Sequence, residues 1–408
     1  MLDTPPAPEM AAPPGLERPR ILFYSHDGTG LGHLRIVLGV TTDLAARRPD
    51  ATLLLLTGSL QAHSLELPPN VDYVKLPAMP KRLLYAGLPT PDVAPSPHRH
   101  VIYVRNAIAR ATIEAFRPHL IVIDHAPAGL FRELAESVEW LHRAAYQPTV
   151  VLLMRDITFG PEQTRGIWHS EGVYDVLERV YDRILVYGSR DVFDPIAEYG
   201  LSPAIAAKTT FCGYLTPPAP TRSPAAVRAE LGTGERPLVA VSVGGGADGA
   251  ALLRAYLSGL RQTPPPAVAS YVVSGPLLPE EDRREIERLA AGVSHLTLTS
   301  FAAGWIDILH AADAVVCMGG YNAMCEAVYA GQRAIVSPRR PGPEEQVIRA
   351  DRFARRGLVT VVPPDRLSPD RLWTEIHRTL DRGTTPGRGL SFAGSRRIVD
   401  ELASLLPR

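Results

Sequence analysis

Short runs of apolar residues recur along the first half of the chain, and longer segments with helical periodicity separate them. The runs are continuous rather than alternating, which is typical of strands buried on both faces in a parallel sheet covered by helices. Residues Leu34–Arg48 and Tyr103–Phe116 are two of the helical segments. This alternation of strand and helix predicts a doubly wound α/β domain. The runs are RILFYS from Arg20, ATLLLLTG from Ala51, VDYVKLP from Val71, LIVIDH from Leu120, TVVLLMRD from Thr149 and RILVYG from Arg183.

The pattern stops at LTPPAPTRSP, residues 215–224, and then restarts. Four prolines in this segment predict an interdomain linker. The later runs PLVAVSVGGG, SYVVSG, HLTLTS, DAVVCMGG, RAIVSP and GLVTVV again alternate with helical segments, and Ser391–Leu406 is amphipathic. We therefore expect a disordered proline-rich tail at 1–19, Rossmann-like domains at 20–214 and 225–385 with the linker between them, and a C-terminal helical segment at 386–408.

Composition narrows the possible classes of protein. The chain has 43 Lys and Arg against 43 Asp and Glu, so no net field would hold a polyanion, and a dedicated nucleic-acid binder is not expected. Cys212, Cys317 and Cys325 are too few for a disulfide framework, and we expect buried, reduced thiols.

The N-terminus lacks signal-peptide features and no apolar stretch reaches 18 residues. We expect a cytoplasmic protein with at most peripheral membrane contact, for which the run Lys81–Tyr85 is the candidate.

A glycine-rich turn follows the first predicted strand. It holds Gly28, Gly30 and Gly32, and His33 comes directly after them at the start of a helix. Glycines let a ligand approach the backbone, and a helix N-terminus favours an anion. The G-x-G-x-G spacing is not that of a dinucleotide site, and the next strand, which ends at Thr57, offers no acid for a ribose. A tight turn without a ligand is the alternative.

Two more glycine turns occur in the second half. Gly244, Gly245 and Gly246 could hold a phosphate through backbone N–H groups, although no G-K-[ST] follows as in a Walker A loop. Asp248 reads most simply as the cap of the next helix.

The third turn, Gly319–Gly320, precedes a helix that carries Glu326. A carboxylate there can accept both hydroxyls of a ribose whose phosphates lie at the helix N-terminus. Glu344, Glu345 and Gln346 open a later helix and could reach a sugar, or Glu344 and Glu345 could simply form a solvated acidic helix start.

Polar residues also end two strands of the first half. Asp124 and His125 follow one strand, and Arg155 and Asp156 follow another. Ligands of open α/β sheets bind outside the carboxyl ends of strands, so these four are candidates for the acceptor side. Capping of neighbouring helices is the alternative. No D-x-D triplet or H-x-x-x-H pair occurs, so we expect no metal and no other cofactor.

Together these motifs resemble the GT-B nucleotide-sugar glycosyltransferases. The resemblance covers nearly all of residues 20–405 and is strongest at Gly319–Arg352. It is closest to the branch that contains the lipid-linked N-acetylglucosaminyltransferase of peptidoglycan synthesis and a group of predicted bacterial glycosyltransferases. It implies a GT-B fold, with two Rossmann-like domains facing across a cleft, the donor in the C-terminal domain and the acceptor in the N-terminal one.

The resemblance also implies roles for single residues. His33 corresponds to the active-site histidine, Glu326 to the ribose-binding glutamate and Gln346 to the sugar-contacting glutamine. The chain departs from the family at Ala247 and Asp248, where the family often has Ser or Gln donors, and it lacks an obvious basic residue near the domain junction. The remaining donor-side candidates are Gly244, Gly245, Gly246, Gly319 and Gly320 for the diphosphate, Phe301 and Ala302 for a uracil edge, and Asn322 and Glu345.

The function expected from these residues is metal-independent, inverting transfer of a sugar from a nucleotide sugar, with UDP favoured, to an acceptor hydroxyl. His33 is the expected general base, and Asp124 and Asp156 are the reserve candidates. The acceptor is left open between a lipid-linked molecule and a small metabolite. The alternatives are a nucleotide-sugar hydrolase or epimerase on the same fold, and a non-catalytic nucleotide-sugar-binding subunit.

Overall fold

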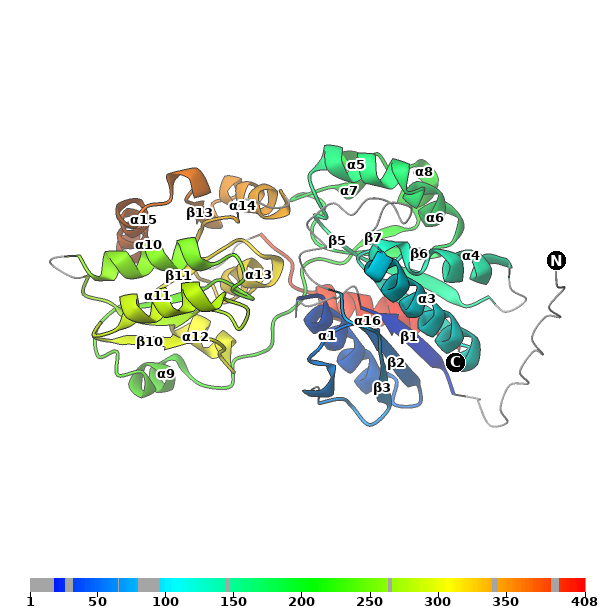
Figure 1. Cartoon of the computed structure of the whole chain (residues 1–408), viewed down its shortest axis with the longest axis horizontal. Helices are drawn as coiled ribbons and strands as arrows, with labels where there is room; N and C mark the ends of the chain where they lie inside the picture. Colours follow the sequence, from blue (N-terminus) through cyan, green and yellow to red (C-terminus); the bar gives the residue numbers. More distant parts are fainter. Residues whose placement is uncertain are drawn as a thin grey trace.

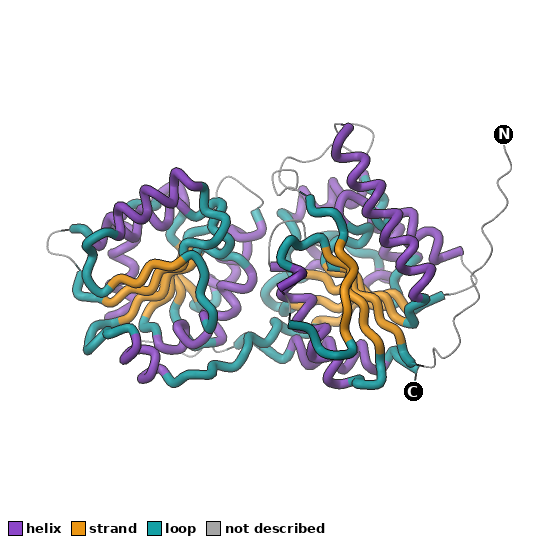
Figure 2. Tube along the Cα trace, turned by 60° about the horizontal axis from the view of Figure 1, so that its bottom comes forward, coloured by secondary structure: helices purple, strands orange, loops and turns teal. Residues whose placement is uncertain are grey.

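The computed structural model describes residues 18–25, 32–64, 66–79, 96–143, 147–262, 266–339, 344–382 and 389–407. Within these ranges the chain forms two halves, each a parallel sheet with helices on both faces (Figures 1 and 2). The predictions for Gly28, Gly30, the run Lys81–Tyr85 and almost all of the N-terminal tail lie outside the described residues.

The first sheet has seven parallel strands in the order β3-β2-β1-β4-β5-β6-β7. Each of the six predicted apolar runs supplies one strand. The seventh, β7, was not predicted, because it has only three half-buried residues, two of them threonines. The strands are β1 (Arg20–Tyr24), β2 (Thr52–Thr57), β3 (Val71–Lys75), β4 (Leu120–Asp124), β5 (Thr149–Arg155), β6 (Arg183–Tyr187) and β7 (Thr209–Phe211).

The second sheet has six parallel strands in the order β10-β9-β8-β11-β12-β13, and every one comes from a predicted run. In each sheet the strand order therefore reverses beside the first strand. The reversal lies between β1 and β4 in the first sheet and between β8 and β11 in the second. This is the switch point at which open α/β sheets bind ligands. The strands are β8 (Leu238–Ser242), β9 (Ala269–Val273), β10 (Leu296–Thr299), β11 (Ala314–Cys317), β12 (Ala334–Val336) and β13 (Val359–Val361).

Helices cover both sheets. The predicted segments at Leu34–Arg48 and Tyr103–Phe116 are helical, and each helix begins a few residues earlier than predicted. In the first half the helices are α1 (Gly32–Arg47), α3 (Ser96–Phe116), α4 (Ala135–Arg143), α5 (Pro161–Ser170), α6 (Val173–Arg179), α7 (Pro195–Glu198) and α8 (Pro203–Ala207), with 3-10 turns η1 (Ala62–Ser64) and η2 (Leu130–Arg132). In the second they are α9 (Pro224–Glu230), α10 (Ala250–Leu260), α11 (Glu280–Ala290), α12 (Trp305–Ala311), α13 (Tyr321–Tyr329), α14 (Glu345–Arg355), α15 (Pro369–Arg382) and α16 (Gly394–Ser404), with η3 (Pro364–Arg366).

The C-terminal helix returns to the first half of the molecule. α16 packs against α1, as its red ribbon beside the blue N-terminal elements shows (Figure 1). The chain leaves the first half at Tyr214 and returns to it before α16, and the two segments lie side by side. Tyr214 N–H donates to Ser391 O at 2.8 Å, and Gly394 N–H donates to Tyr214 O at 2.9 Å. A Cβ on Gly394 would lie 2.5 Å from the Tyr214 carbonyl oxygen, so only glycine fits this crossing. The domain boundaries stay a prediction.

Apolar contacts also join the two halves. Tyr321 of α13 is buried against Tyr187 at the end of β6 and against Tyr214 just before the crossing, with ring centroids 5.4 and 6.0 Å apart. Phe353 of α14 also contacts Tyr214, at 5.7 Å. One continuous hydrophobic core therefore runs from the first sheet into the second.

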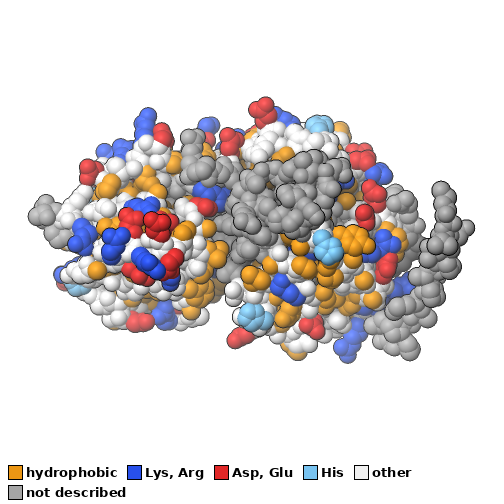
Figure 3. All heavy atoms as spheres, in the orientation of Figure 1, with side chains coloured by type: hydrophobic (Ala, Val, Ile, Leu, Met, Phe, Trp, Pro, Cys, Tyr) orange, Lys and Arg blue, Asp and Glu red, His pale blue; other side chains and the backbone are white. Residues whose placement is uncertain are grey.

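Charges are mixed on the outer surface of the second half (Figure 3). Arg254 of α10, for example, pairs with Asp282 and Glu285 of α11. Such pairing gives no single-sign surface, so ligand binding must come from local groups. All three cysteines are free and buried, which confirms the sequence-based prediction.

Candidate active site

The start of α1 and the end of β4 bring His33 and Asp124 together. His33 Nδ1 lies 2.7 Å from Asp124 Oδ2, and Tyr187 donates its hydroxyl to Asp124 Oδ1 at 3.2 Å. The Asp124 side chain is fully buried, whereas that of His33 is 21% exposed. An ionised carboxylate can only accept hydrogen bonds, so the proton of neutral His33 belongs on Nδ1. The Nε2 lone pair is then the basic site of this dyad.

Arg155 faces that lone pair from the end of β5. Its Nη2 lies 3.3 Å from His33 Nε2. Burial and then the charge of Arg155 hold the pKa of His33 well below its ordinary 6.5, while Glu345 acts in the opposite direction. His125 completes the group with its ring centroid 4.9 Å from that of His33, on a backbone in the left-handed region (φ 63°). Three of the four strand-end residues predicted for the acceptor side, Asp124, His125 and Arg155, therefore lie together around His33.

Asp156 belongs to a different group. Its Oδ1 accepts from Arg349 Nη2 of α14 at 3.2 Å and from the Ile157 N–H at 2.8 Å. Tyr214 donates its hydroxyl to Oδ2 at 3.4 Å. Both members of the ion pair are fully buried. This carboxylate is thus engaged in joining the two halves, and its role as a reserve base stays a prediction.

The glycine turn after β8 leaves space on one side and is tightly packed on the other. Gly246 has φ 90°, and a Cβ there would lie 2.3 Å from Ser274 O, so packing explains this glycine. Gly244 has φ 63° and nothing within 4 Å of a Cβ, so it faces open space. The prediction of Asp248 as a helix cap is wrong. Gly249 is the N-cap of α10, and Asp248 Oδ2 lies 3.2 Å from Arg339 Nη1, which draws the acid away from the helix start.

Arg339 connects the loops after β8 and β12. It is 9% exposed, and its backbone N–H donates to Gln346 Oε1 at 3.1 Å. A Cβ on Gly319 would lie 3.6 Å from the Gln346 Cβ, so the predicted sugar-contacting glutamine lies against the glycine turn after β11. Since β11 lies between β8 and β12 in the sheet, the Arg339 guanidinium bridges the loops on either side of the third glycine turn.

Glu345 lies between an arginine of each half. Its Oε1 is 3.8 Å from Arg339 Nη2, and its Oε2 is 3.5 Å from Arg155 Nη1. The sequence predicted Glu345 as a sugar contact or a solvated helix start. The second interpretation is wrong, because the side chain is only 16% exposed and faces both arginines.

Glu326 lies on α13 as predicted, but it is not exposed. Its side chain is 8% exposed, and Oε1 is 2.6 Å from Nη2 of Arg35 on α1. Burial raises the pKa of Glu326, and Arg35 opposes this shift. The starts of the two helices face each other nearby, since a Cβ on Gly32 would lie 4.0 Å from Asn322 Nδ2. The predicted ribose ligand thus holds a cation from the other half.

The two remaining donor candidates follow β10 at the edge of the second sheet. Phe301 is 64% exposed, and Ala302 is partly buried. The exposed Phe301 ring is therefore accessible to a planar base. Gly320 is the N-cap of α13, and a Cβ added to it would meet nothing within 4 Å.

The sequence did not single out several residues of this site. Tyr187 ends β6 and Arg339 lies three residues after β12, so the rule that polar residues at strand ends form sites would have found both. Arg35, Tyr321 and Arg349 lie within helices, where no local signal separates them from surface or core residues.

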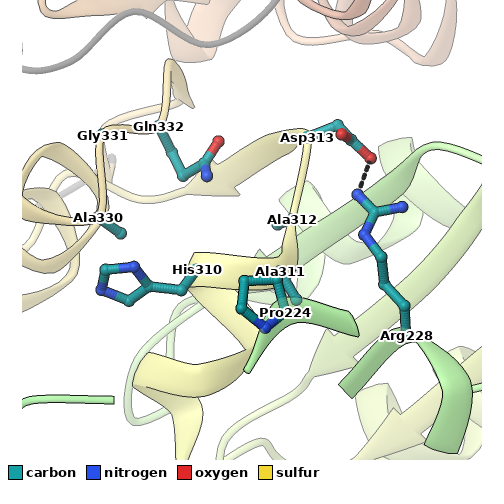
Figure 4. A pocket seen from close by; sticks show the side chains of 9 residues that line it. All are labelled: Pro224, Arg228, His310, Ala311, Ala312, Asp313, Ala330, Gly331 and Gln332. Carbon is teal, nitrogen blue, oxygen red and sulfur yellow. Dashed lines mark hydrogen bonds and ion pairs between the residues drawn. The ribbon is translucent and has the colours of Figure 1, made fainter. Parts of the chain in front are cut away.

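A cavity of about 380 Å³ lies at the opposite end of the second sheet (Figure 4). Asp313, which precedes β11, and Gln332, which precedes β12, line it together with His310 of α12 and Arg228 of α9. Arg228 pairs with Asp313. This cavity is at the amino ends of the strands, whereas His33, Arg155 and Arg339 lie at or beyond carboxyl ends, so it is separate from the candidate site.

Two kinds of feature are absent from the described residues. No group of three or more His, Cys, Asp or Glu that could hold a metal ion occurs among them. No helix in these ranges is long and apolar enough to cross a membrane.

Comparison with known proteins gives matches of three kinds. Residues 240–388 match the glycosyltransferase family 28 C-terminal domain. An uncharacterized glycosyltransferase of Methanopyrus kandleri is 28% identical over 101 residues, which span 25% of this chain and 29% of the relative. The match therefore spans less than a third of this relative.

Two solved structures agree over nearly the whole chain. Acinetobacter baumannii MurG superposes with a TM-score of 0.59 at 15% identity, covering 95% of this chain and 99% of that one. A Listeria monocytogenes protein assigned as a UDP-N-acetylglucosamine 2-epimerase superposes with a TM-score of 0.63 at 11% identity, covering 95% and 96%. Identities this low show a common fold. The predicted resemblance is thus confirmed: the chain has the GT-B fold, and residues 240–388 match the glycosyltransferase family 28 C-terminal domain.

Proposed function

We propose that the chain transfers a sugar from a nucleotide-sugar donor, with UDP favoured, to an acceptor hydroxyl. The observation that carries the proposal is the 2.7 Å contact between His33 Nδ1 and the buried carboxylate of Asp124, in a fold shared with glycosyltransferases. This contact leaves Nε2 as the only basic atom of the ring. His33 Nε2 accepts the proton of the acceptor hydroxyl, and Asp124 stabilises the imidazolium that forms.

The donor side of the proposal rests on the second half. The departing diphosphate gains negative charge, which the N-terminus of α13 and the guanidinium of Arg339 can stabilise, and Gly244 leaves space for the diphosphate beside them. Glu326 accepts hydrogen bonds from the ribose once Arg35 releases it. A base on one side of the sugar and a leaving group on the other give a single displacement with inversion.

The test is a turnover assay with UDP-, TDP- and GDP-sugars against lipid-linked and small-molecule acceptors. The proposal expects nucleoside diphosphate release that requires an acceptor, and a product of inverted anomeric configuration by NMR. Asp124→Asn should reduce kcat, because an amide no longer favours the Nδ1–H tautomer. If Asp124→Asn and His33→Ala both turn over at the wild-type rate, the assignment of His33 as the base is wrong.

Metal independence is part of this proposal. Arg339 and the helix N-terminus supply the positive charge that a metal supplies in other sites. Transfer should therefore persist in excess EDTA, measured as initial rate after dialysis. Loss of the rate in EDTA and its return with magnesium or manganese would show that these groups do not suffice.

A second candidate is epimerisation of the nucleotide sugar. The specific observation is the superposition on the Listeria monocytogenes structure, with a TM-score of 0.63. Incubation with the donor alone separates the two functions. Epimerisation converts the nucleotide sugar to its epimer without an acceptor, whereas glycosyl transfer leaves its sugar configuration unchanged in the absence of one.

A further inference from the structure

Six charged or ionisable side chains form an unbroken line from the glycine turn after β8 to the His33–Asp124 dyad. The first three belong to the second half of the molecule and the last three to the first half. In order, the contacts are Asp248 Oδ2 to Arg339 Nη1 at 3.2 Å, Arg339 Nη2 to Glu345 Oε1 at 3.8 Å, Glu345 Oε2 to Arg155 Nη1 at 3.5 Å, Arg155 Nη2 to His33 Nε2 at 3.3 Å, and His33 Nδ1 to Asp124 Oδ2 at 2.7 Å.

Glu345 is the shared member of this line. Its two carboxylate oxygens face different arginines, and both separations exceed the usual 2.7–2.9 Å of a charge-assisted hydrogen bond. Arg339 and Arg155 are only 9% and 11% exposed, so water can replace little of what Glu345 provides. Glu345 is shared between two arginines. When another anion pairs with one arginine, the Glu345 carboxylate can move closer to the other.

Arg155 obstructs the atom on which the proposed chemistry depends. Its Nη2–H points to His33 Nε2, whose lone pair would take the proton of an acceptor. A cation at this distance also disfavours protonation of the ring. In this structure, Arg155 therefore occupies His33 Nε2 and makes that nitrogen a weaker base.

We propose that Glu345 is a positioning residue that couples the donor's diphosphate to the general base. A diphosphate bound to Arg339 replaces Glu345 as its counter-ion and repels the Glu345 carboxylate toward Arg155. Arg155 then pairs closely with Glu345 and leaves His33 Nε2, which becomes free to accept a proton. This inference rests on the proposed function, and it makes the base available only when a donor is in place.

The test follows the titration of His33 by NMR in protein labelled with ¹⁵N-histidine, with and without saturating UDP. Among the residues that the structure describes, the charged and titratable groups that face His33 are Asp124 and His125 at the end of β4, Arg155 at the end of β5 and Glu345 on α14, with Tyr187 of β6 behind Asp124. In the wild type, UDP should raise the pKa of His33 by about one unit, because Arg155 moves away.

Glu345→Gln should abolish most of this UDP-dependent rise, since a neutral amide cannot draw Arg155 from the ring. Glu344→Gln is the matched control: it removes an acid one residue earlier, on an exposed side chain, and should keep the full rise. The coupling is overturned if Glu345→Gln shows the wild-type rise, or if wild-type His33 does not respond to UDP that calorimetry shows to be bound. If calorimetry detects no binding of UDP, TDP or GDP, the proposed function itself fails.

Kinetics give a second, independent measurement. Glu345→Gln should lower kcat about tenfold with little change in the donor KM, whereas a residue that only contacts the sugar would raise KM. In an Arg155→Met background, Glu345→Gln should have no further effect, because Glu345 acts through Arg155. Additive losses in the double variant would overturn the coupling.

Discussion

The contacts between the two halves differ between the α14 side and the α13 side. On the α14 side, Arg349, Arg352 and Arg356 pair with Asp156, Glu198 and Asp191 of the first half, and the Arg349–Asp156 pair is fully buried. On the α13 side, Glu326 pairs with Arg35, whose side chain is 51% exposed. The chemistry of the pairs is the same, but only the Arg349–Asp156 pair is closed to water on both sides, since Arg352 and Arg356 are 37% and 32% exposed.

Burial decides what such a pair can do. When a fully buried pair breaks, each charge loses its partner without gaining water, so the α14 side should stay closed. When Arg35 leaves Glu326, water can solvate the guanidinium but reaches little of the Glu326 carboxylate, which is 8% exposed, so the α13 side opens at less cost than breaking the fully buried Arg349–Asp156 pair. The side that opens more easily is the side that carries the predicted ribose ligand.

The largest effect expected from this contrast is on stability. Arg349→Met leaves Asp156 buried without its cation and should lower the free energy of unfolding by about 3–5 kcal/mol. Arg352→Met on the same helix removes a partly exposed pair and should cost at most about 1 kcal/mol. Urea titration at neutral pH measures both. Equal losses would show that burial is not what separates the two kinds of contact.

The next effect concerns the base, which belongs to neither pair. His33→Ala should lower kcat by about 10²–10⁴ and leave the donor KM nearly unchanged, because His33 lies in the half opposite the donor. Burial and Arg155 depress the pKa of His33 in the ligand-free protein, so the unprotonated base persists as pH falls, and the acid limb of the kcat/KM profile, which reports the free enzyme, should lie below 6.5. The profile of kcat/KM against pH measures this limb. A fully active His33→Ala would pass the role of base to Asp124 or Asp156.

The sequence predicted the strands and the glycine turns because their signals are local. Twelve of the thirteen strands appear as apolar runs, and the polar residues that end β4 and β5 marked the carboxyl edge of the first sheet correctly. Pairing across the two halves leaves no such signal. Nothing around Glu326 or Asp156 indicates that each meets an arginine from a distant helix.

The lack of a sequence signal for distant contacts also explains why the interpretations of Glu326 and Asp248 were incomplete or wrong. Glu326 was interpreted only as a ribose ligand, because the helical period alone cannot show that Arg35 of the other half covers it. Asp248 was interpreted as a cap because it precedes a helix, yet its partner Arg339 lies 91 residues away. Both errors concern a charge whose counter-ion is distant in the sequence.

A smaller effect is expected when Glu326, the acid of the pair with Arg35, is removed. Glu326→Ala should weaken nucleotide-sugar binding about 10- to 100-fold, because the net loss is about one charge-assisted hydrogen bond to the ribose, roughly 1.5–3 kcal/mol. Glu326→Gln keeps the shape and should give an intermediate loss. Calorimetry measures the affinity, and thermal unfolding checks that both variants remain folded. Unchanged donor affinity in both would remove Glu326 from the site.

The smallest effect, and the one that best separates the alternatives, is expected for Arg35. If Arg35 only holds Glu326 in the absence of donor, binding must first break this ion pair, whose arginine is 51% exposed, and a pair worth about 1 kcal/mol means that Arg35→Met should raise donor affinity about fivefold. If Arg35 instead turns to the donor's phosphates, the same substitution should lower the affinity. Salt sharpens the distinction, because high ionic strength weakens the exposed pair in the wild type. The advantage of Arg35→Met over wild type should therefore shrink as salt rises, and calorimetry at low and high salt measures it. An affinity loss in Arg35→Met would place Arg35 among the donor ligands and make the α13 side a part of the binding site that closes on the donor.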